Sequence, residues 1–267
     1  MTPFAFHRPV SIAAALQLHQ AGDDARYLAG GQSLLPAMKL GLAAPAELID
    51  LSLLPGAHTI AVEAGQLRIG AMSPHAAVAA SAEVRRHIPA LAVLAEGIGD
   101  PAVRSRGTLG GSLAQNDPAA CWPAAALGLG ATVHTDRRRI AADDFFKGLY
   151  ETALEPGELI TAVSLPIPQR AAYVKFKQPA SRFALVGVFI SQGPERRSST
   201  RVAVTGAGPC VFRAAAFEAA LAGDWSAQAL QGLSVPADGL NTDLHASAAY
   251  RAHLVGVLAR RAVVQAG

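Results

Sequence analysis

Cysteine is almost absent from this chain, and its scarcity excludes two classes of protein. Only Cys121 and Cys210 occur among 267 residues, and they lie far apart. Two cysteines cannot ligate an iron–sulfur cluster by themselves, and a disulfide-stapled fold needs more of them. A cluster-bearing protein and a disulfide scaffold are therefore both excluded.

Long apolar runs and dense basic segments are also missing. The alanine-rich stretches are interrupted by Gly, Pro and charged residues, so none reaches transmembrane length. The first 20 residues lack a basic n-region and predict an amphipathic helix capped at Ser11, not a signal peptide. We therefore expect a soluble, cytoplasmic protein with no integral membrane segment.

The charge balance gives no sign of a nucleic-acid partner. The net charge is +3, and no basic run carries interleaved aromatic residues. The basic clusters at residues 137–139 and 196–197 are interpreted as solvated turns. Apolar residues make up 51% of the chain, which is enough for one large domain or two modest ones.

Familiar catalytic and metal-binding patterns are absent as well. There is no G-x-S-x-G segment, and no pair of histidines has metal-ligand spacing with a third ligand nearby. We expect no metal site and interpret each histidine as a surface residue or a hydrogen-bonded core residue: His7, His19, His58, His75, His87, His134, His245 and His253.

Hydrophobic patterning predicts a two-part chain with a change of composition after Pro168. The first part alternates helices and strands, and the second is expected to hold three strands packed by helices. The predicted helices span residues 10–20, 83–96, 119–127, 213–222 and 244–264. The last is expected to be amphipathic, with these residues near one face: Leu244, Ala248, Leu254, Val257, Leu258 and Val264. The predicted strands span 27–29, 48–51, 59–62, 67–69, 131–135, 139–140, 159–165, 173–177, 183–191 and 201–205, and residues 97–112 are expected to form a loop.

Two glycine-paired loops carry the strongest functional signal. Residues 29–34 read AGGQSL and residues 108–112 read TLGGS, so each has two adjacent glycines followed by a hydroxyl within two residues. Adjacent glycines let backbone N–H groups turn toward an anion. Either loop alone could be an ordinary turn, but the pair predicts a clamp on a dinucleotide pyrophosphate, with Asn116 and Asp117 as acceptors for sugar hydroxyls.

A third glycine segment, residues 206–211, is a weaker candidate for a dinucleotide site. Val211 stands where close helix–strand packing requires Gly or Ala, and Pro209 removes an N–H group. A plain tight turn is the better interpretation.

With these loops in place, the chain resembles the FAD-binding medium subunits of the molybdenum hydroxylases, of the carbon monoxide dehydrogenase and xanthine dehydrogenase type. The similar segments are AGGQSLLPAMKL, RGTLGGSLAQNDPAA, DDFF, ELITAVSLP and FKQPASRFALVGV, in the family's order over about residues 3–260. The resemblance implies an α+β chain. A vanillyl-alcohol-oxidase-type (PCMH-like) FAD-binding domain would span 1–168, with α/β subdomains of about 1–55 and 56–168. A smaller α+β domain with a three-stranded antiparallel sheet would span 169–267.

The resemblance also implies where FAD lies. Backbone of the two loops would meet the pyrophosphate, Ile98 and Ile160 would line the cofactor, and Lys177 would place a cation near the flavin. The expected cofactor-binding residues are Leu28, Ala29, Gly30, Gly31, Gln32, Ser33, Leu34, Ile98, Thr108, Leu109, Gly110, Gly111, Ser112, Asn116, Asp117, Ile160, Lys177 and Phe183. Two positions depart from the family: Cys121 replaces a common acidic residue, and Phe183 stands where close relatives often have tyrosine.

By this resemblance the chain is an electron-transfer subunit without catalytic residues of its own. It would accept electrons from two [2Fe–2S] clusters of a small partner subunit and pass them to an external acceptor, while substrate reacts at a molybdopterin in a large partner. The complex would be a heterotrimer, possibly dimerised. Two alternatives stay open: a stand-alone flavin oxidoreductase of the same fold, and a degenerate binding module that has lost flavin.

Overall fold

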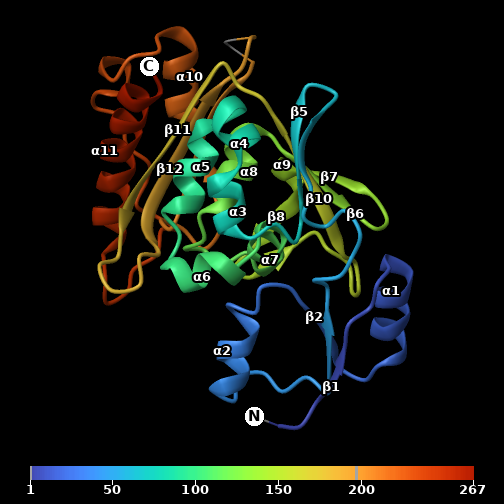
Figure 1. The fold of residues 1–267 in the computed structure, drawn as a ribbon. Helices are drawn as coiled ribbons and strands as arrows, with labels where there is room; N and C mark the ends of the chain where they lie inside the picture. The colour runs from blue at the N-terminus through green and yellow to red at the C-terminus, as the bar shows by residue number, and fades with distance from the viewer. Residues whose placement is uncertain (1, 196–197) are drawn as a thin grey trace.

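The N-terminal part of the chain is a small parallel sheet. In the computed structural model, which describes residues 2–195 and 198–267, its strand order is β1–β3–β2, and it lies at the bottom of Figure 1. The expected cap is confirmed, because the Ser11 hydroxyl accepts a hydrogen bond from the Ala14 N–H at 3.2 Å. The elements are β1 (Ala5–His7), α1 (Ile12–Ala21), β2 (Ala25–Leu28), α2 (Leu34–Lys39) and β3 (Glu47–Asp50).

The middle part is built on a five-stranded antiparallel sheet of order β4–β5–β10–β6–β7. The predicted hairpin is confirmed, and its turn contains Ala64 at φ 48° and Gly65 at φ 75°. The strands are β4 (Ile60–Glu63), β5 (Gln66–Gly70), β6 (Thr132–Thr135), β7 (Arg139–Ala141) and β10 (Ile160–Pro166), with a separate pair β8 (Phe146–Gly148) and β9 (Glu151–Thr152).

The helices of this part differ from the prediction in two places. The helix predicted over 83–96 is wrong as a single element: it breaks at Ile88, whose φ of −140° and ψ of 72° are not helical and which precedes Pro89. The loop predicted over 97–112 is also wrong, because it contains one helix and the start of another. The helices are α3 (His75–Ala80), α4 (Ala82–His87), α5 (Pro89–Glu96), α6 (Pro101–Arg106), α7 (Leu109–Gln115), α8 (Trp122–Leu129) and α9 (Ala142–Phe145).

The C-terminal sheet has four strands, not the three predicted. The fourth, β14 (Phe212–Arg213), pairs with β13 over only two residues, which is too short to leave a pattern in the sequence. The other elements are β11 (Arg170–Lys177), β12 (Ala184–Gln192), β13 (Thr200–Thr205), α10 (Ala215–Gly223), η1 (Gln228–Leu230) and α11 (Ala248–Ala266). Arg196 and Arg197, expected in a solvated turn, lie outside the described residues.

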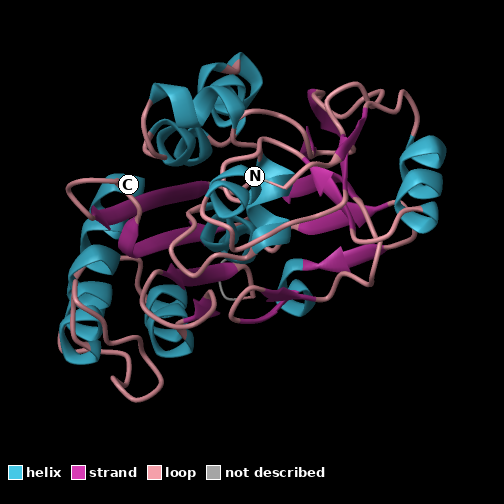
Figure 2. Cartoon of the chain, turned by 90° about the horizontal axis from the view of Figure 1, so that it is seen from below, coloured by secondary structure: helices cyan, strands magenta, loops and turns pink. Residues whose placement is uncertain are grey.

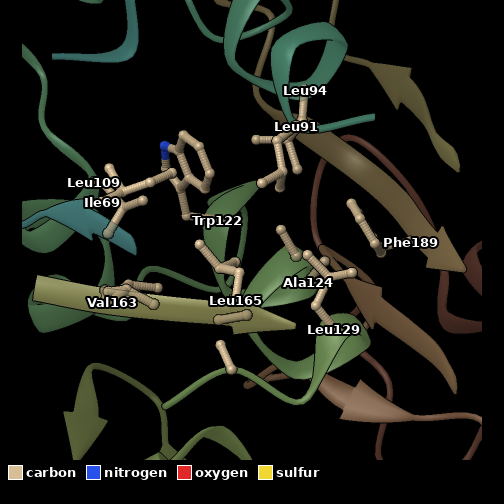
Figure 3. Close-up of a cluster of buried hydrophobic side chains, with 14 of the residues drawn as sticks. Ile69, Leu91, Leu94, Leu109, Trp122, Ala124, Leu129, Val163, Leu165 and Phe189 are labelled. Atoms are coloured by element: carbon tan, nitrogen blue, oxygen red, sulfur yellow. The ribbon is translucent and has the colours of Figure 1, made fainter. Parts of the chain in front are cut away.

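Strand β12 is buried along its whole length because helices cover both faces of the sheet. Phe189 packs in the core shared with α5 and α8, where Leu91, Leu94 and Ala124 surround it (Figure 3). Val188 faces the second core, formed with α10 and α11. The predicted C-terminal helix begins later than expected, at Ala248. Of the residues expected near one face, Leu254 and Leu258 are buried, whereas Leu244, which precedes the helix, is 90% exposed and Val264 is 74% exposed.

The C-terminal sheet holds the segment that leads into α8. The Thr205 hydroxyl lies 2.9 Å from the Pro118 carbonyl oxygen and 2.7 Å from that of Ala120. The N–H groups of Gly206 and Ala184 donate to the carbonyls of Pro118 and Ala119. These contacts join the middle part to the C-terminal part, whose strands and long helix lie near the C-terminus in Figure 2. No helix in the described ranges is long and apolar enough to cross a membrane.

Replacing Thr205 by valine tests this attachment. Thr205 is fully buried, so Thr205→Val keeps the shape but removes the one hydroxyl proton that the carbonyl oxygens of Pro118 and Ala120 can accept. We expect the free energy of unfolding to fall by about 1–3 kcal/mol in urea titrations. The exposed Thr2→Val is the control. An unchanged midpoint for Thr205→Val would show that the hydroxyl does not stabilise the junction.

Candidate cofactor site

One cavity of about 520 Å³ lies where the three parts of the chain meet. This volume is typical of small-molecule sites. Its wall includes the first glycine loop from the N-terminal part, the segment around residues 107–112 from the middle part, and Lys175, Ser181, Arg182 and Phe183 from the C-terminal part. The site therefore depends on all three parts being docked.

The first glycine loop presents unused hydrogen-bond donors to this cavity. Strand β2 ends at Leu28, and α2 begins at Leu34, so residues 29–33 form the turn between them. Gly31 takes φ 73°, a left-handed conformation that disfavours residues with a side chain. Among the described residues, the N–H groups of residues 30–33 donate to no protein acceptor. Together they suit an anion or another group rich in acceptor oxygens.

The second glycine segment has a different role from the one predicted. It forms the first turn of α7, and its amides already serve the protein: Leu109 N–H donates to Ser73 O, and Gly110 N–H donates to Ala71 O. The Gly111 N–H donates to the Thr108 hydroxyl oxygen at 3.1 Å. At Gly110, an added Cβ would lie 2.6 Å from the Ala71 Cβ. The glycine here allows close packing.

The two glycine segments are brought together at Gly30. A Cβ on Gly30 would lie 2.1 Å from the Arg106 carbonyl oxygen and 2.7 Å from the Gly107 Cα. Real Cβ atoms do not approach backbone this closely, so only glycine fits. This contact docks the first loop against the end of α6 and sets one edge of the cavity.

Lys175 and Cys121 meet at the part of the wall supplied by the C-terminal sheet. The Lys175 ammonium donates to the carbonyl oxygens of Gly97 at 2.8 Å and Arg182 at 2.9 Å, and contacts the Cys121 sulfur at 3.4 Å. Cys121 is 4% exposed and is a free thiol. One cation therefore ties three segments of the wall together and places a positive charge beside the cavity.

His75 also lines the cavity and was not predicted as a site residue. Its side chain is buried, and the Trp122 Nε1–H donates to His75 Nδ1 at 3.0 Å. Burial, helped by the nearby positive charge of Arg104, lowers the pKa of His75 to about 4. The ring is therefore neutral near pH 7. A sequence pattern could not single it out, because Trp122 is 47 residues away.

Most of the residues predicted to bind the cofactor do line this one cavity. They are Leu28, Ala29, Gly30, Gly31, Gln32, Ser33, Leu34, Ile98, Thr108, Gly110, Gly111, Ser112, Asp117, Ile160 and Phe183.

Leu109, Asn116 and Lys177 do not line the cavity. Leu109 is 1% exposed and packs in the core beside Ile69 and Trp122 (Figure 3). Asn116 donates through its side-chain amide to the carbonyls of Gly148 and Glu151, so it holds the β8–β9 turn. Lys177 is exposed beyond a bulge in β11, and Lys175 lies at the cavity instead.

Comparison with known proteins identifies this arrangement. Residues 2–168 match the FAD binding domain in molybdopterin dehydrogenase, and residues 171–266 match the CO dehydrogenase flavoprotein C-terminal domain. The chain belongs to this family. It is an FAD-binding medium subunit of the molybdenum hydroxylase type, an oxidoreductase component, as the resemblance in the sequence indicated.

Individual relatives are similar over nearly the whole chain. The nicotine 6-hydroxylase medium subunit of Paenarthrobacter nicotinovorans is 38% identical, covering 97% of this chain and 95% of the relative. The carbon monoxide dehydrogenase medium chain of Afipia carboxidovorans is 35% identical, with 98% and 96% covered. A solved structure of reconstituted CO dehydrogenase from Oligotropha carboxidovorans superposes with a TM-score of 0.89 at 34% identity, covering 99% and 98% of the two chains.

The cavity wall fits FAD, the cofactor of this family. The free N–H groups of residues 30–33 match the acceptor oxygens of a pyrophosphate. Ile98, Ile160 and Phe183 supply apolar wall for a planar ring system. In the described part of the chain, no group of three His, Cys, Asp or Glu residues is placed to hold a metal ion.

Gly30→Ala tests the close approach that defines the site. The new Cβ would meet the Arg106 carbonyl, so the loop must shift. We expect at least a tenfold weaker affinity for FAD and a loss of about 1–3 kcal/mol in the free energy of unfolding. Titration of the apoprotein by flavin fluorescence and urea unfolding measure these effects.

Gly223→Ala is the matched control, because nothing lies within 4 Å of its Cβ position. Equal effects of the two substitutions, or none from Gly30→Ala, would contradict the assignment of Gly30 as the contact between the loops.

Proposed function

We propose that this subunit holds FAD in the cavity and relays electrons from [2Fe–2S] clusters of a small partner to an external acceptor. Substrate would be oxidised at a molybdopterin in a large partner. The observation that carries the proposal is the row of unused N–H donors at residues 30–33, facing a cavity whose other walls come from two further parts of the chain. FAD supplies the redox chemistry, and this chain's side chains supply its position and electrostatic surroundings.

The proposed roles follow from what each group offers. The N–H groups of residues 30–33 hold the pyrophosphate, and the hydroxyls of Ser33, Thr108 and Ser112 add donors around it. The Asp117 carboxylate accepts from cofactor hydroxyls with the oxygen it does not use for the Ala119 N–H. Leu28, Ala29, Gln32, Leu34, Gly110 and Gly111 complete the wall around the pyrophosphate.

The surrounding organisation is proposed on the same basis. The FAD domain would span 1–168 as two subdomains of the vanillyl-alcohol-oxidase type, of about 1–55 and 56–168, and the second domain 169–267. The separate sheets before and after residue 55 and the four-stranded sheet from residue 170 support these limits. The medium-chain relatives support a complex with further subunits, which we propose to be a heterotrimer in the cytoplasm, where free thiols such as Cys121 persist.

Reconstitution of the purified chain with FAD tests the function. We expect the chain to bind FAD and to show flavin absorbance, and to lack hydroxylase activity without its partners. Co-purified complex should contain flavin, iron and molybdenum together, by absorbance and metal analysis. A chain that takes up no flavin after FAD is supplied under native conditions would overturn the proposal.

Lys175, and not Lys177, is the cation we propose to stabilise reduced flavin. Lys175→Met removes the charge from the cavity wall, so we expect the two-electron reduction potential of bound FAD to fall by about 30 mV or more, equivalent to about a tenfold change in the equilibrium.

Lys177→Met is the matched control, since it removes the same charge from the same strand outside the cavity. Spectroelectrochemical titration of both variants gives the comparison. A larger shift for Lys177→Met would show that the bulge in β11 does not decide which lysine acts on the flavin.

A further inference from the structure

The imidazole of His75 is held in one tautomer by a buried neighbour. The indole N–H of Trp122 can only donate, and it lies 3.0 Å from His75 Nδ1, so Nδ1 must be an unprotonated acceptor. A neutral ring with an unprotonated Nδ1 carries its hydrogen on Nε2. Trp122 is 1% exposed and packed on both sides in the core (Figure 3), so it cannot swing away without disturbing that packing.

The Nε2–H that results has no partner within the protein. Among residues 2–195 and 198–267, no hydrogen bond joins it to an acceptor, although His75 as a whole is only 5% exposed. Leaving this donor unpaired once the cavity is filled would cost about 1–3 kcal/mol. Buried polar groups in folded proteins almost always have a partner, and His75 lines the cavity, so the partner is expected among the atoms that occupy it.

The position of His75 indicates which part of the cavity this donor serves. The His75 N–H donates to the Gly107 carbonyl at 2.9 Å, and a Cβ on Gly107 would lie 2.7 Å from His75 Nε2. Gly107 in turn contacts Gly30. The imidazole edge therefore stands at the junction of the two glycine segments, on the same cavity as the free amides of residues 30–33.

We propose that His75 binds FAD directly, donating from Nε2 to an acceptor oxygen of the cofactor near its pyrophosphate, and that Trp122 is the positioning residue that keeps the proton on Nε2. The inference rests on the proposed FAD site. It adds a neutral side-chain donor to a cradle otherwise made of backbone N–H groups and hydroxyls. The ring needs no charge for this role, because a second proton would have to enter at Nδ1 and face the indole N–H.

Substitutions at three positions test this role. His75→Phe keeps a planar ring but removes the donor, and we expect the Kd for FAD to rise roughly tenfold. His75→Gln retains an N–H donor and should recover part of the affinity. Trp122→Phe leaves the imidazole in place but frees its tautomer, so a smaller rise, of roughly threefold, is expected. His134→Phe is the control, because His134 binds the Ser164 hydroxyl and does not line the cavity.

The readouts separate binding from folding. Circular dichroism and thermal melting of each apoprotein come first, followed by FAD titration. A folded His75→Phe variant with the wild-type Kd overturns the proposal. If that variant does not fold, long-range ¹H–¹⁵N spectra of the wild-type chain decide: the His75 signal should show the Nε2–H tautomer, and its Nε2 resonance should shift when FAD is added. The Nδ1–H tautomer, or no shift at saturation, overturns it.

The same FAD titration distinguishes the role of His75 from the proposed FAD site itself. If the wild-type chain binds no FAD, both the cofactor assignment and the role of His75 are overturned. If the wild-type chain binds FAD and a folded His75→Phe variant binds it equally well, only the role of His75 is overturned.

Discussion

The site depends on one steric constraint: Gly30 lies against the backbone of Arg106 and Gly107 with no space for a Cβ atom. This approach docks the N-terminal part, roughly the first fifty residues with their small parallel sheet, onto the middle part of the chain. The free N–H groups of the first loop then face the same cavity as Thr108, Ser112 and His75. A cavity between separately folded units needs such a contact, because side chains at the junction would otherwise hold the backbones apart.

The two glycine pairs look alike in the sequence but have different structural roles. In the first loop, Gly31 supplies a left-handed turn, Gly30 supplies close contact, and the amides stay free. In the second, the amides of residues 109–112 are bound within the protein, and Gly110 lets α7 approach Ala71. The two segments therefore line the same cavity but differ in how their amides are used. In the proposed site, the first loop would supply most of the donors and the second would supply a surface of the cavity wall.

Much of this architecture could be predicted from the sequence, and the failures have physical causes. The 59–69 hairpin was predicted from two short strands around a turn, and strand β12 from a continuous apolar run that matches its burial on both faces. The 97–112 segment was misassigned because its helices, of six and seven residues, are too short to show a hydrophobic period. Lys175 and Lys177 share one face of an ideal strand, so only the bulge between Phe176 and Lys177 separates them. His75 was missed because its partner Trp122 comes from a distant helix.

Cofactor binding and domain docking are thermodynamically coupled in such an arrangement. The wall of the cavity is contributed by three parts of the chain, so FAD contacts all of them only when they are assembled. A ligand that binds the assembled state alone stabilises it by mass action. The carbonyls of residues 118–120 are held by Thr205, Gly206 and Ala184, and the next residue, Cys121, contacts Lys175 at the cavity. The junction between the middle and C-terminal parts thus leads directly to the cavity wall, so loosening the junction would also disturb the proposed FAD site.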